Sequence, residues 1–467
     1  MEQTGFGSSQ SGGSGVKREA IELSGAFERY RQAVPERRVA EMVKGQAAFS
    51  REGPLSAWTV IWLMIYQRLD AKGTLAVAVR ELMTGPIQAY VRWREGAPAA
   101  RLSPNTSAYS QARSKLPLEL VEKVSDMIFE SLQQQPRILP DLERPLFLLD
   151  GTSMQLQHNQ SLVEQFPPSS NRHGKSHWPV MRVVVAHDVV SGLAVRPCWG
   201  PMQGPHTVSE QALTKEIIQR LPAGCGVLGD RNFGIFSMAW HASQHDHPCL
   251  FRLTEVRAKK LNGSSELPAG MDRQILWIPS REDLRNNQEI PAESSVQGRL
   301  LSFRVPDARG FQQELFFFTT MTLPAKKILE LYGYRWNIET DLRSLKREVR
   351  LHMLDAKSPT MVAKELMLAV AAYNLTRDAM NQAGLALGLE PRQLSFSLAQ
   401  DTLNAFLPVL ANATNDQQRH QILQEMLRVF SYSKLPQRNR NPYPREVWPK
   451  TRSFPTRKPP PKQHQLA

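Results

Sequence analysis

Between residues 145 and 320 the chain alternates short apolar runs with segments of helical periodicity. Runs at 145–150, 183–185, 226–230 and 248–253 are typical of buried strands, and helical patterns occur at 206–221 and 235–243. A last strand is expected at 314–320. Strands that alternate with helices predict an α/β fold, in which helices cover a sheet.

Helical patterns flank this α/β region, and five segments are expected around and within it. Residues 1–18 are rich in Gly and Ser and are expected to be disordered, and residues 19–140 are expected to form a helical domain. The α/β domain is expected at 141–383, with a mostly β insertion at about 254–313. A helix is expected from Pro324 to about Leu351, and further helices fill 384–433.

The charge of the chain is concentrated at its C-terminal end. The 467 residues include 58 Lys+Arg and 44 Asp+Glu, which gives a formal net charge of +14. Nine basic residues lie from Lys434 onward against one acidic residue, Glu446, so +8 belongs to the proline-rich segment 434–467. This composition predicts a disordered, extended tail. Nucleic acid is the simplest polyanionic partner for it, and a solubilising tail is the alternative.

Composition also argues against a membrane or secreted protein. The longest apolar run, from Trp58 to Tyr66, is far shorter than the roughly 20 residues of a membrane span. The first residues lack the apolar stretch of a signal peptide, and the three cysteines are scattered. A reducing cytoplasm and no membrane partner are therefore expected.

Two aspartates follow strand-like runs, Asp150 after Leu-Phe-Leu-Leu and Asp230 after Val-Leu-Gly. A carboxylate at the end of a strand is held rigidly, and oxygen ligands suit Mg²⁺. The alternative for either residue is a turn former or a helix cap. A metal site of this kind needs a third carboxylate.

The expected helix after Pro324 supplies that carboxylate. Tyr332, Arg335, Glu339 and Lys346 are spaced by three, four and seven residues, which places them within an arc of roughly 60° on one helix. Glu339 then borders the apolar stripe, where a carboxylate is costly unless it is paired or bound to a metal. The alternative is an ordinary Arg335–Glu339 pair one helical turn apart.

These residues resemble a known family. Tyr332-x2-Arg335-x3-Glu339-x6-Lys346 looks like the Tyr-Arg-Glu-Lys signature of DDE transposases of the insertion-sequence-4 family. Leu-Leu-Asp150-Gly-Thr and Gly-Asp230-Arg-Asn-Phe-Gly resemble the surroundings of the family's first two catalytic aspartates. The resemblance covers about residues 145–380 well and the helical N-terminus loosely, and the β insertion between Asp230 and Glu339 also matches.

The resemblance implies an RNase H-like core that cuts the ends of an insertion sequence and joins them to target DNA. Asp150, Asp230 and Glu339 would be catalytic and would hold two Mg²⁺ ions, with Mn²⁺ as a substitute. Tyr332, Arg335 and Lys346 would grip terminal phosphates.

The implied partner is double-stranded DNA, as terminal inverted repeats and as target. The family also implies a homodimer in a synaptic complex in the bacterial cytoplasm, associated with the nucleoid through DNA. The 384–433 region would then serve synapsis. For 19–140, binding of DNA ends and a purely structural bundle both stay open.

Other residues carry weaker expectations. Trp277 is the only tryptophan of the insertion, and it either stacks on a flipped base or belongs to the insertion's own core. His206, before a helix, and Arg231, beside Asp230, are candidate DNA contacts; the alternatives are a loop histidine without a DNA role and, for Arg231, neutralisation of the acidic cluster. A basic loop is a candidate lining of a DNA channel and consists of Arg172, His173, Lys175 and His177. Three aromatic residues at helical spacing are expected in the core: Trp58, Trp62 and Tyr66.

Two other functions remain compatible with the sequence. One is a catalytically silent, transposase-derived regulator that binds DNA ends, which the complete set of three carboxylates disfavours. The other is an RNase H-like nuclease that cuts without joining, which Arg335 and Lys346 at the family's spacing disfavour. The terminal repeats, the target preference and the excision route are left open by the sequence.

Overall fold

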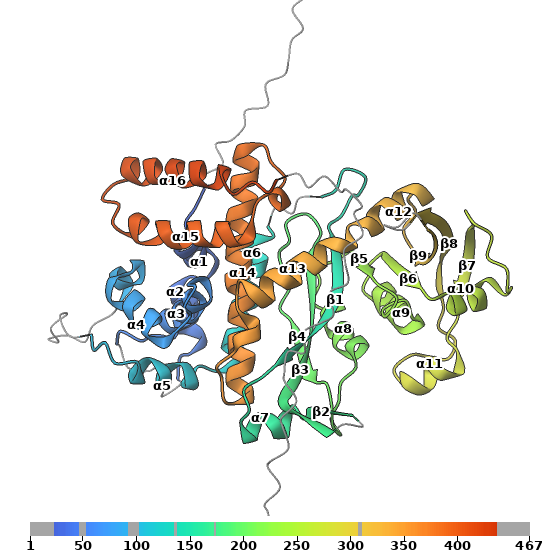
Figure 1. Cartoon of the computed structure of the whole chain (residues 1–467), viewed down its shortest axis with the longest axis horizontal. Coiled ribbons are helices and arrows are strands. Elements are labelled where there is room, and N and C mark those ends of the chain that lie inside the picture. Colours follow the sequence, from blue (N-terminus) through green and yellow to red (C-terminus); the bar gives the residue numbers. More distant parts are fainter. Residues whose placement is uncertain are drawn as a thin grey trace, which may run out of the picture.

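The fold is that of a computed structural model, which describes residues 23–45, 53–91, 102–134, 138–171, 174–306 and 311–436 (Figure 1). The expected disordered segment 1–18, the residues Arg172 and His173, and nearly all of the basic tail lie outside these ranges. The side chain of Lys175 lies outside them too.

A mixed sheet forms the centre of the molecule (Figure 1). Its strands run in the order β2-β3-β1-β5-β6-β9-β8-β7, and β4 pairs with β3. β1 is antiparallel to β3 but parallel to β5, and β5 is parallel to β6. The strands of this part are β1 (Leu146–Gln155), β2 (Pro168–Asn171), β3 (Gly174–Asp188), β4 (Cys198–Pro201), β5 (Gly226–Gly229) and β6 (Cys249–Leu253).

The insertion after β6 extends this sheet. β9 pairs with β6, β8 pairs with β9 and β7 pairs with β8, all antiparallel. Two helices lie between these strands, so the segment is less purely β than expected; Thr254 and Ser280 cap them. The elements are α10 (Glu255–Asn262), β7 (Asp272–Trp277), α11 (Arg281–Asn286), β8 (Val296–Pro306) and β9 (Gln312–Thr319).

Alternation along the strands divides the core into two layers. Phe147 and Leu149 of β1 join one hydrophobic cluster, and Leu146 and Leu148 join the other, because successive side chains point to opposite faces. The first cluster contains the buried faces of α8 (Glu210–Ile218) and α9 (Phe236–Gln244). The second contains those of α13 (Arg335–Arg347) and α14 (Pro359–Leu387).

α14 also joins the sheet to the helices of the N-terminal and C-terminal parts, and Figure 1 shows it standing between them. It packs on α3 and α6, which precede the sheet in the sequence, and on α15 and α16, which follow it. These regions therefore share one core, in which Trp58 and Trp62 are buried, as expected. No helix in the described ranges is long and apolar enough to cross a membrane.

The remaining helices complete this body. In the N-terminal part they are α1 (Ala26–Ala33), α2 (Glu36–Met42), α3 (Ala57–Leu69), α4 (Leu75–Thr84), η1 (Pro86–Tyr90), α5 (Ser107–Lys115) and α6 (Leu118–Leu132). The others are α7 (Gln160–Gln165), α12 (Ala325–Gly333), η2 (Leu351–Met353), η3 (Pro391–Gln393), α15 (Phe396–Ala411) and α16 (Asp416–Ser431).

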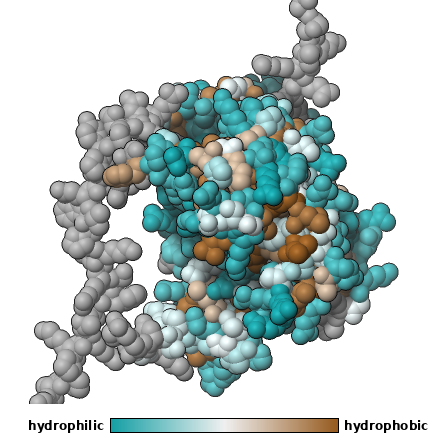
Figure 2. All heavy atoms as spheres, turned by 90° about the vertical axis from the view of Figure 1, so that its right-hand side faces the viewer, coloured by the Kyte–Doolittle hydropathy of each residue, from teal (hydrophilic) through white to brown (hydrophobic). Residues whose placement is uncertain are grey.

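The side of the molecule formed by the insertion is shown in Figure 2 and is mostly hydrophilic. Brown, hydrophobic residues gather in the middle of this face. Exposed hydrophobic residues of the insertion include Val256 on α10, Leu276 on the edge strand β7, and Ile278 directly after it.

Candidate active site

Asp150 and Asp230 come from neighbouring parallel strands. β1 and β5 pair as far as Leu148 and Leu228, so each aspartate lies two residues beyond the last paired position. Asp230 directly follows β5, as expected. Asp150 was also expected at the end of a strand, but it lies within β1. β1 continues to Gln155 because β3 goes on pairing with it on the other side.

The two carboxylates are fixed by hydrogen bonds to nearby backbone groups. The N–H of Gly151 donates to Asp150 Oδ1 (2.8 Å), and the N–H of Asn232 donates to Asp230 Oδ1 (2.8 Å). The pKa of Asp150 is raised to about 6, mainly by burial and also by the neighbouring negative charges of Asp230 and Glu210, against the opposing effects of the Gly151 hydrogen bond and Arg335. The site therefore concentrates negative charge in a partly buried place, which favours a cation.

The segment with the other predicted site residues is broken into two helices. α12 ends at Gly333 and α13 begins at Arg335, so Tyr332 does not share a helix with Arg335, Glu339 and Lys346. The N–H groups of Tyr334 and Asn337 donate to carbonyls three residues earlier, which is the tighter 3₁₀ pattern. The single predicted helix from Pro324 to about Leu351 was wrong at this point.

Tyr332 is buried beside the site. Its ring packs against Phe317, with centroids 4.6 Å apart. Burial raises the pKa of Tyr332, whereas Arg252 and Arg335 lower it. Its hydroxyl is buried and makes no hydrogen bond of good geometry to any described residue, although Arg252 is near enough to lower its pKa.

Arg335 interacts with both Glu339 and Asp150. Its guanidinium donates to Glu339 Oε1 at 3.2 Å and lies 5.0 Å from the ring centroid of the exposed Trp336. Its charge also lowers the pKa of Asp150. Lys346 is half-buried, and burial lowers its pKa while Asp150 opposes that shift. Arg335 and Lys346 thus both act on Asp150, and Glu339 is held by Arg335.

α13 is anchored to the rest of the fold by a residue that the sequence did not single out. Asp341 is fully buried and forms ion pairs with Arg377 of α14 and with Arg392 of η3. Arg392 makes two hydrogen bonds to the carboxylate, at 2.8 and 2.9 Å. Burial would raise the pKa of Asp341, but Arg392 and Arg377 outweigh it and lower the pKa to about 2. Asp341 lies two residues from Glu339, so this ion cluster fixes the helix that carries Glu339.

A second residue that sequence reasoning missed is Glu210, the first residue of α8. Its negative charge contributes to the raised pKa of Asp150, so it lies in the same acidic site. The sequence showed only a helix start after Ser209, and acids are common there. Within the described residues, no group of three or more His, Cys, Asp and Glu side chains is arranged to hold a metal ion.

Trp277 occupies the core and not the surface of the site. It is 6% exposed and packs edge-on against Phe236 and Phe318, with centroid distances of 6.0 and 4.7 Å. A side chain that is only 6% exposed offers little surface to a flipped base, so this geometry does not support the stacking role. The insertion's strands join the main sheet, and a large aromatic ring on an inward-facing position is buried with them.

Among the other candidates, His206 and Arg231 are both exposed. His206 lies in the turn between β4 and α8, and Arg231 directly follows Asp230. Arg231, Arg252 and Arg304 line a cavity of about 670 Å³ at the ends of β6 and β9. His177, which was expected in a basic loop, lies on β3 and stacks on His158, with centroids 4.0 Å apart.

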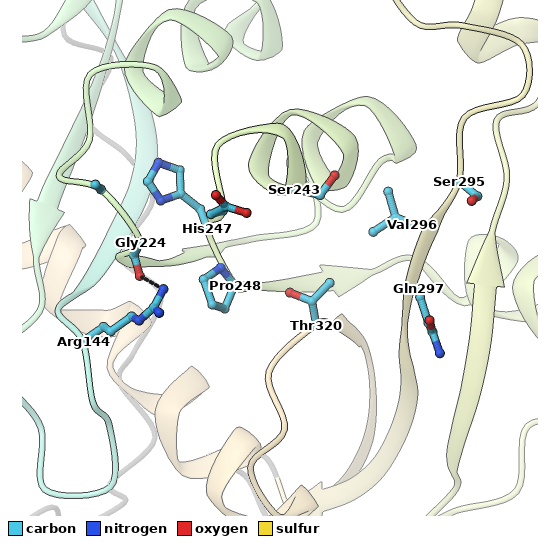
Figure 3. Close-up of a pocket in the computed structure, with 11 residues that line it drawn as sticks. Arg144, Gly224, Ser243, His247, Pro248, Ser295, Val296, Gln297 and Thr320 are labelled. Carbon is cyan, nitrogen blue, oxygen red and sulfur yellow. Dashed lines mark hydrogen bonds between the residues drawn. The ribbon is translucent and has the colours of Figure 1, made fainter.

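A separate cavity of about 750 Å³ lies at the opposite ends of the parallel strands (Figure 3). Gly224 and Pro248, which line it, precede β5 and β6, whereas Asp230 follows β5. In this cavity Arg144 donates to the carbonyl of Gly224 at 3.1 Å (Figure 3). It is therefore not part of the carboxylate site.

Comparison with known proteins gives the following similarities. Residues 141–375 match the family described as "Transposase DDE domain". The transposase InsG for insertion sequence element IS4 of Escherichia coli (strain K12) is 24% identical over 365 residues, which cover 75% of this chain and 78% of that protein. A cryo-EM structure of the piggyBac transposase synaptic complex with hairpin DNA covers 90% of this chain and 88% of its own, with 11% identity and a TM-score of 0.44. The last similarity is too low to carry an argument.

Proposed function

The chain belongs to the transposase DDE domain family and is a DNA transposase, and we propose that Asp150, Asp230 and Glu339 are its catalytic carboxylates. The observation that carries this proposal is the register of β1 and β5, which brings Asp150 and Asp230 to the same end of the sheet. The strand order β4-β3-β1-β5-β6, antiparallel and then parallel, supports an RNase H-like core.

The donor set suits a hard divalent cation such as Mg²⁺ or Mn²⁺. Asp150 and Asp230 offer carboxylate oxygens whose charges already repel each other, and oxygen is the ligand that Mg²⁺ prefers. Glu339 is paired with Arg335, so it joins the two aspartates only when Arg335 turns to another anion. Divalent cations bound here would lower the pKa of an attacking hydroxyl group and stabilise the departing oxygen of a phosphodiester.

The basic residues around the carboxylates hold the DNA. Arg335 can make a bidentate contact to a phosphate, and Lys346 adds a point charge near Asp150. The hydroxyl of Tyr332 can donate to a phosphate oxygen. Arg231 and His206, which are exposed at the same end of the sheet, contact the backbone of the flanking DNA.

The proposed reaction is cleavage at the ends of the element followed by joining of those ends to target DNA. Synapsis of two ends requires two copies of the chain, so we propose a homodimer on DNA. Light scattering of the chain mixed with DNA that carries a terminal repeat tests this. The mass of the complex is expected to correspond to two chains with two DNA ends, and a complex of one chain with two DNA ends would contradict the homodimer.

The experiment for the catalytic residues is cleavage and joining of a DNA that carries the element's own ends, with Mg²⁺ or Mn²⁺. Asp150→Asn, Asp230→Asn and Glu339→Gln are each expected to lower cleavage by more than about 100-fold, beyond the usual cost of changing an outer-shell partner of a metal site. Asp246→Asn is the matched control, because Asp246 lines the cavity at the opposite end of the strands and its left-handed backbone tolerates Asn.

The products distinguish the possible outcomes. Joined products from the natural chain support transposition, whereas cut and unjoined products indicate a nuclease. Full cleavage by the Asp150→Asn variant would refute this active site, and binding without any metal-dependent cleavage would indicate a silent regulator.

A further inference from the structure

The carboxylate of Glu210 is pressed against the backbone of β1 beside Asp150. A Cβ atom placed on Gly151 would lie 1.9 Å from Glu210 Oε1 and 2.5 Å from its carboxyl carbon, which is far inside van der Waals contact. Only glycine at position 151 leaves room for this approach. Gly151 follows Asp150 directly, so the first residue of α8 touches the strand at the catalytic position.

The same carboxylate also contacts the loop that carries Asp230. Asn232 Nδ2 donates to Glu210 Oε2, and the N–H of Asn232 donates to Asp230 Oδ1 at 2.8 Å. Gln211, the next residue of α8, donates through Nε2 to Asn232 Oδ1 at 2.7 Å, which orients the amide of Asn232. A continuous chain of contacts therefore joins the backbone at Gly151 to the carboxylate of Asp230.

From this geometry we propose that Glu210 is a positioning residue of the metal site, which sets the separation of Asp150 and Asp230 through Gly151 and Asn232. The inference rests on the proposed function, which assigns the two aspartates to metal binding. The alternative is that Glu210 only stabilises the N-terminus of α8 through the helix dipole. Its carboxylate, however, contacts Gly151 and Asn232. Outer-shell contacts of this kind orient the ligands of a metal and alter its affinity.

The test measures Mn²⁺ affinity of the full chain without DNA, by calorimetry, so its readout does not depend on transposition. Glu210→Gln and Asn232→Ala are each expected to weaken Mn²⁺ binding by about tenfold. Asn232→Ala removes no charge, so its effect reports position and not electrostatic attraction. Glu210 and Asn232 belong to the same chain of contacts, so their effects are not expected to add. The Mn²⁺ affinity of the double variant is expected to lie within about twofold of that of the weaker-binding single variant.

Glu216→Gln is the matched control, because Glu216 lies on the same helix and its side chain is 57% exposed. It loses the same charge and is expected to bind Mn²⁺ like the natural chain. Natural affinity in both Glu210→Gln and Asn232→Ala, with weak binding in Asp150→Asn, would overturn this inference alone. Natural affinity in Asp150→Asn as well would refute the metal site itself. If Glu210→Gln does not fold, Asn232→Ala decides between these outcomes.

Discussion

Replacing Asp341 by asparagine tests whether the buried ion cluster holds α13 in place. The substitution keeps the shape of the side chain but removes the negative charge shared by two arginines. Arg377 is 3% exposed and Arg392 is 19% exposed, so neither guanidinium regains much water when its partner is lost. Removing one partner of a buried ion pair costs about 3–5 kcal/mol, and this range is the expected loss in the free energy of unfolding.

The measurement is urea unfolding in the presence of a chelator, followed by fluorescence and circular dichroism. Glu339→Gln is the control on the same helix, because its pair with Arg335 is partly exposed, 45% at Glu339 and 21% at Arg335. Exposed pairs contribute about 0–1 kcal/mol, so this variant is expected to unfold almost like the natural chain. An Asp341→Asn variant that loses less than about 1 kcal/mol would refute the anchoring role.

The dependence of stability on acidic pH gives a second measurement of the same ion cluster. The pKa of Asp341 is lowered to about 2 in the folded chain, against an ordinary value of 3.8, so the carboxylate stabilises the fold above about pH 4. This contribution is lost as the pH falls from about 4 through about 2. The difference in stability between the natural chain and Asp341→Asn is therefore expected to shrink over that range, and a difference that does not change with pH would contradict the assignment.

Three further predictions concern Glu81, the pair of tryptophans Trp277 and Trp336, and Arg231. Glu81 is buried and accepts a hydrogen bond from Trp62, and burial raises its pKa to about 8. The Glu81→Gln variant should therefore have a higher melting temperature than the natural chain, by a margin that grows from about pH 4.5 to pH 8. Melting temperatures that change in parallel with pH would contradict this. Trp277→Ala should lower the free energy of unfolding by about 3–5 kcal/mol through a core cavity. Trp336→Ala should leave stability intact and weaken binding of unpaired DNA bases by about 1–3 kcal/mol; equal effects of the two tryptophan variants in both assays would refute the distinction. Arg231→Gln should reduce the salt dependence of DNA binding by about one phosphate contact, measured by titration at several salt concentrations, and an unchanged slope would exclude that contact.

Much of the sheet was predictable because buried strands leave a local pattern. The apolar runs before Asp150 and Asp230 became β1 and β5, and the run at 248–253 became β6. The two hydrophobic layers follow from alternation along β1, which is a property of neighbouring residues. The parallel pairing of β1 and β5 is not local, and it is this pairing that brings the two aspartates to one end of the sheet.

The errors arose where tertiary packing overrides local preference. The pattern from Pro324 onward is helical throughout, but the chain turns at Tyr334, which separates Tyr332 from α13. Trp277 was unassigned by its sequence because an aromatic residue on a strand is equally compatible with a core and with a binding face. Its packing on Phe236 and Phe318 decides for the core.

The sequence by itself determined most of the strands and helices, the family signature, and the identities of the carboxylates that we propose for catalysis. Each of these depends on residues close together in the chain, where periodicity and spacing carry the information. Only the tertiary structure revealed Glu210 against Gly151 and Asp341 between Arg377 and Arg392. These contacts join residues that are distant in sequence, and their strength comes from burial, which no local pattern of residue types reports.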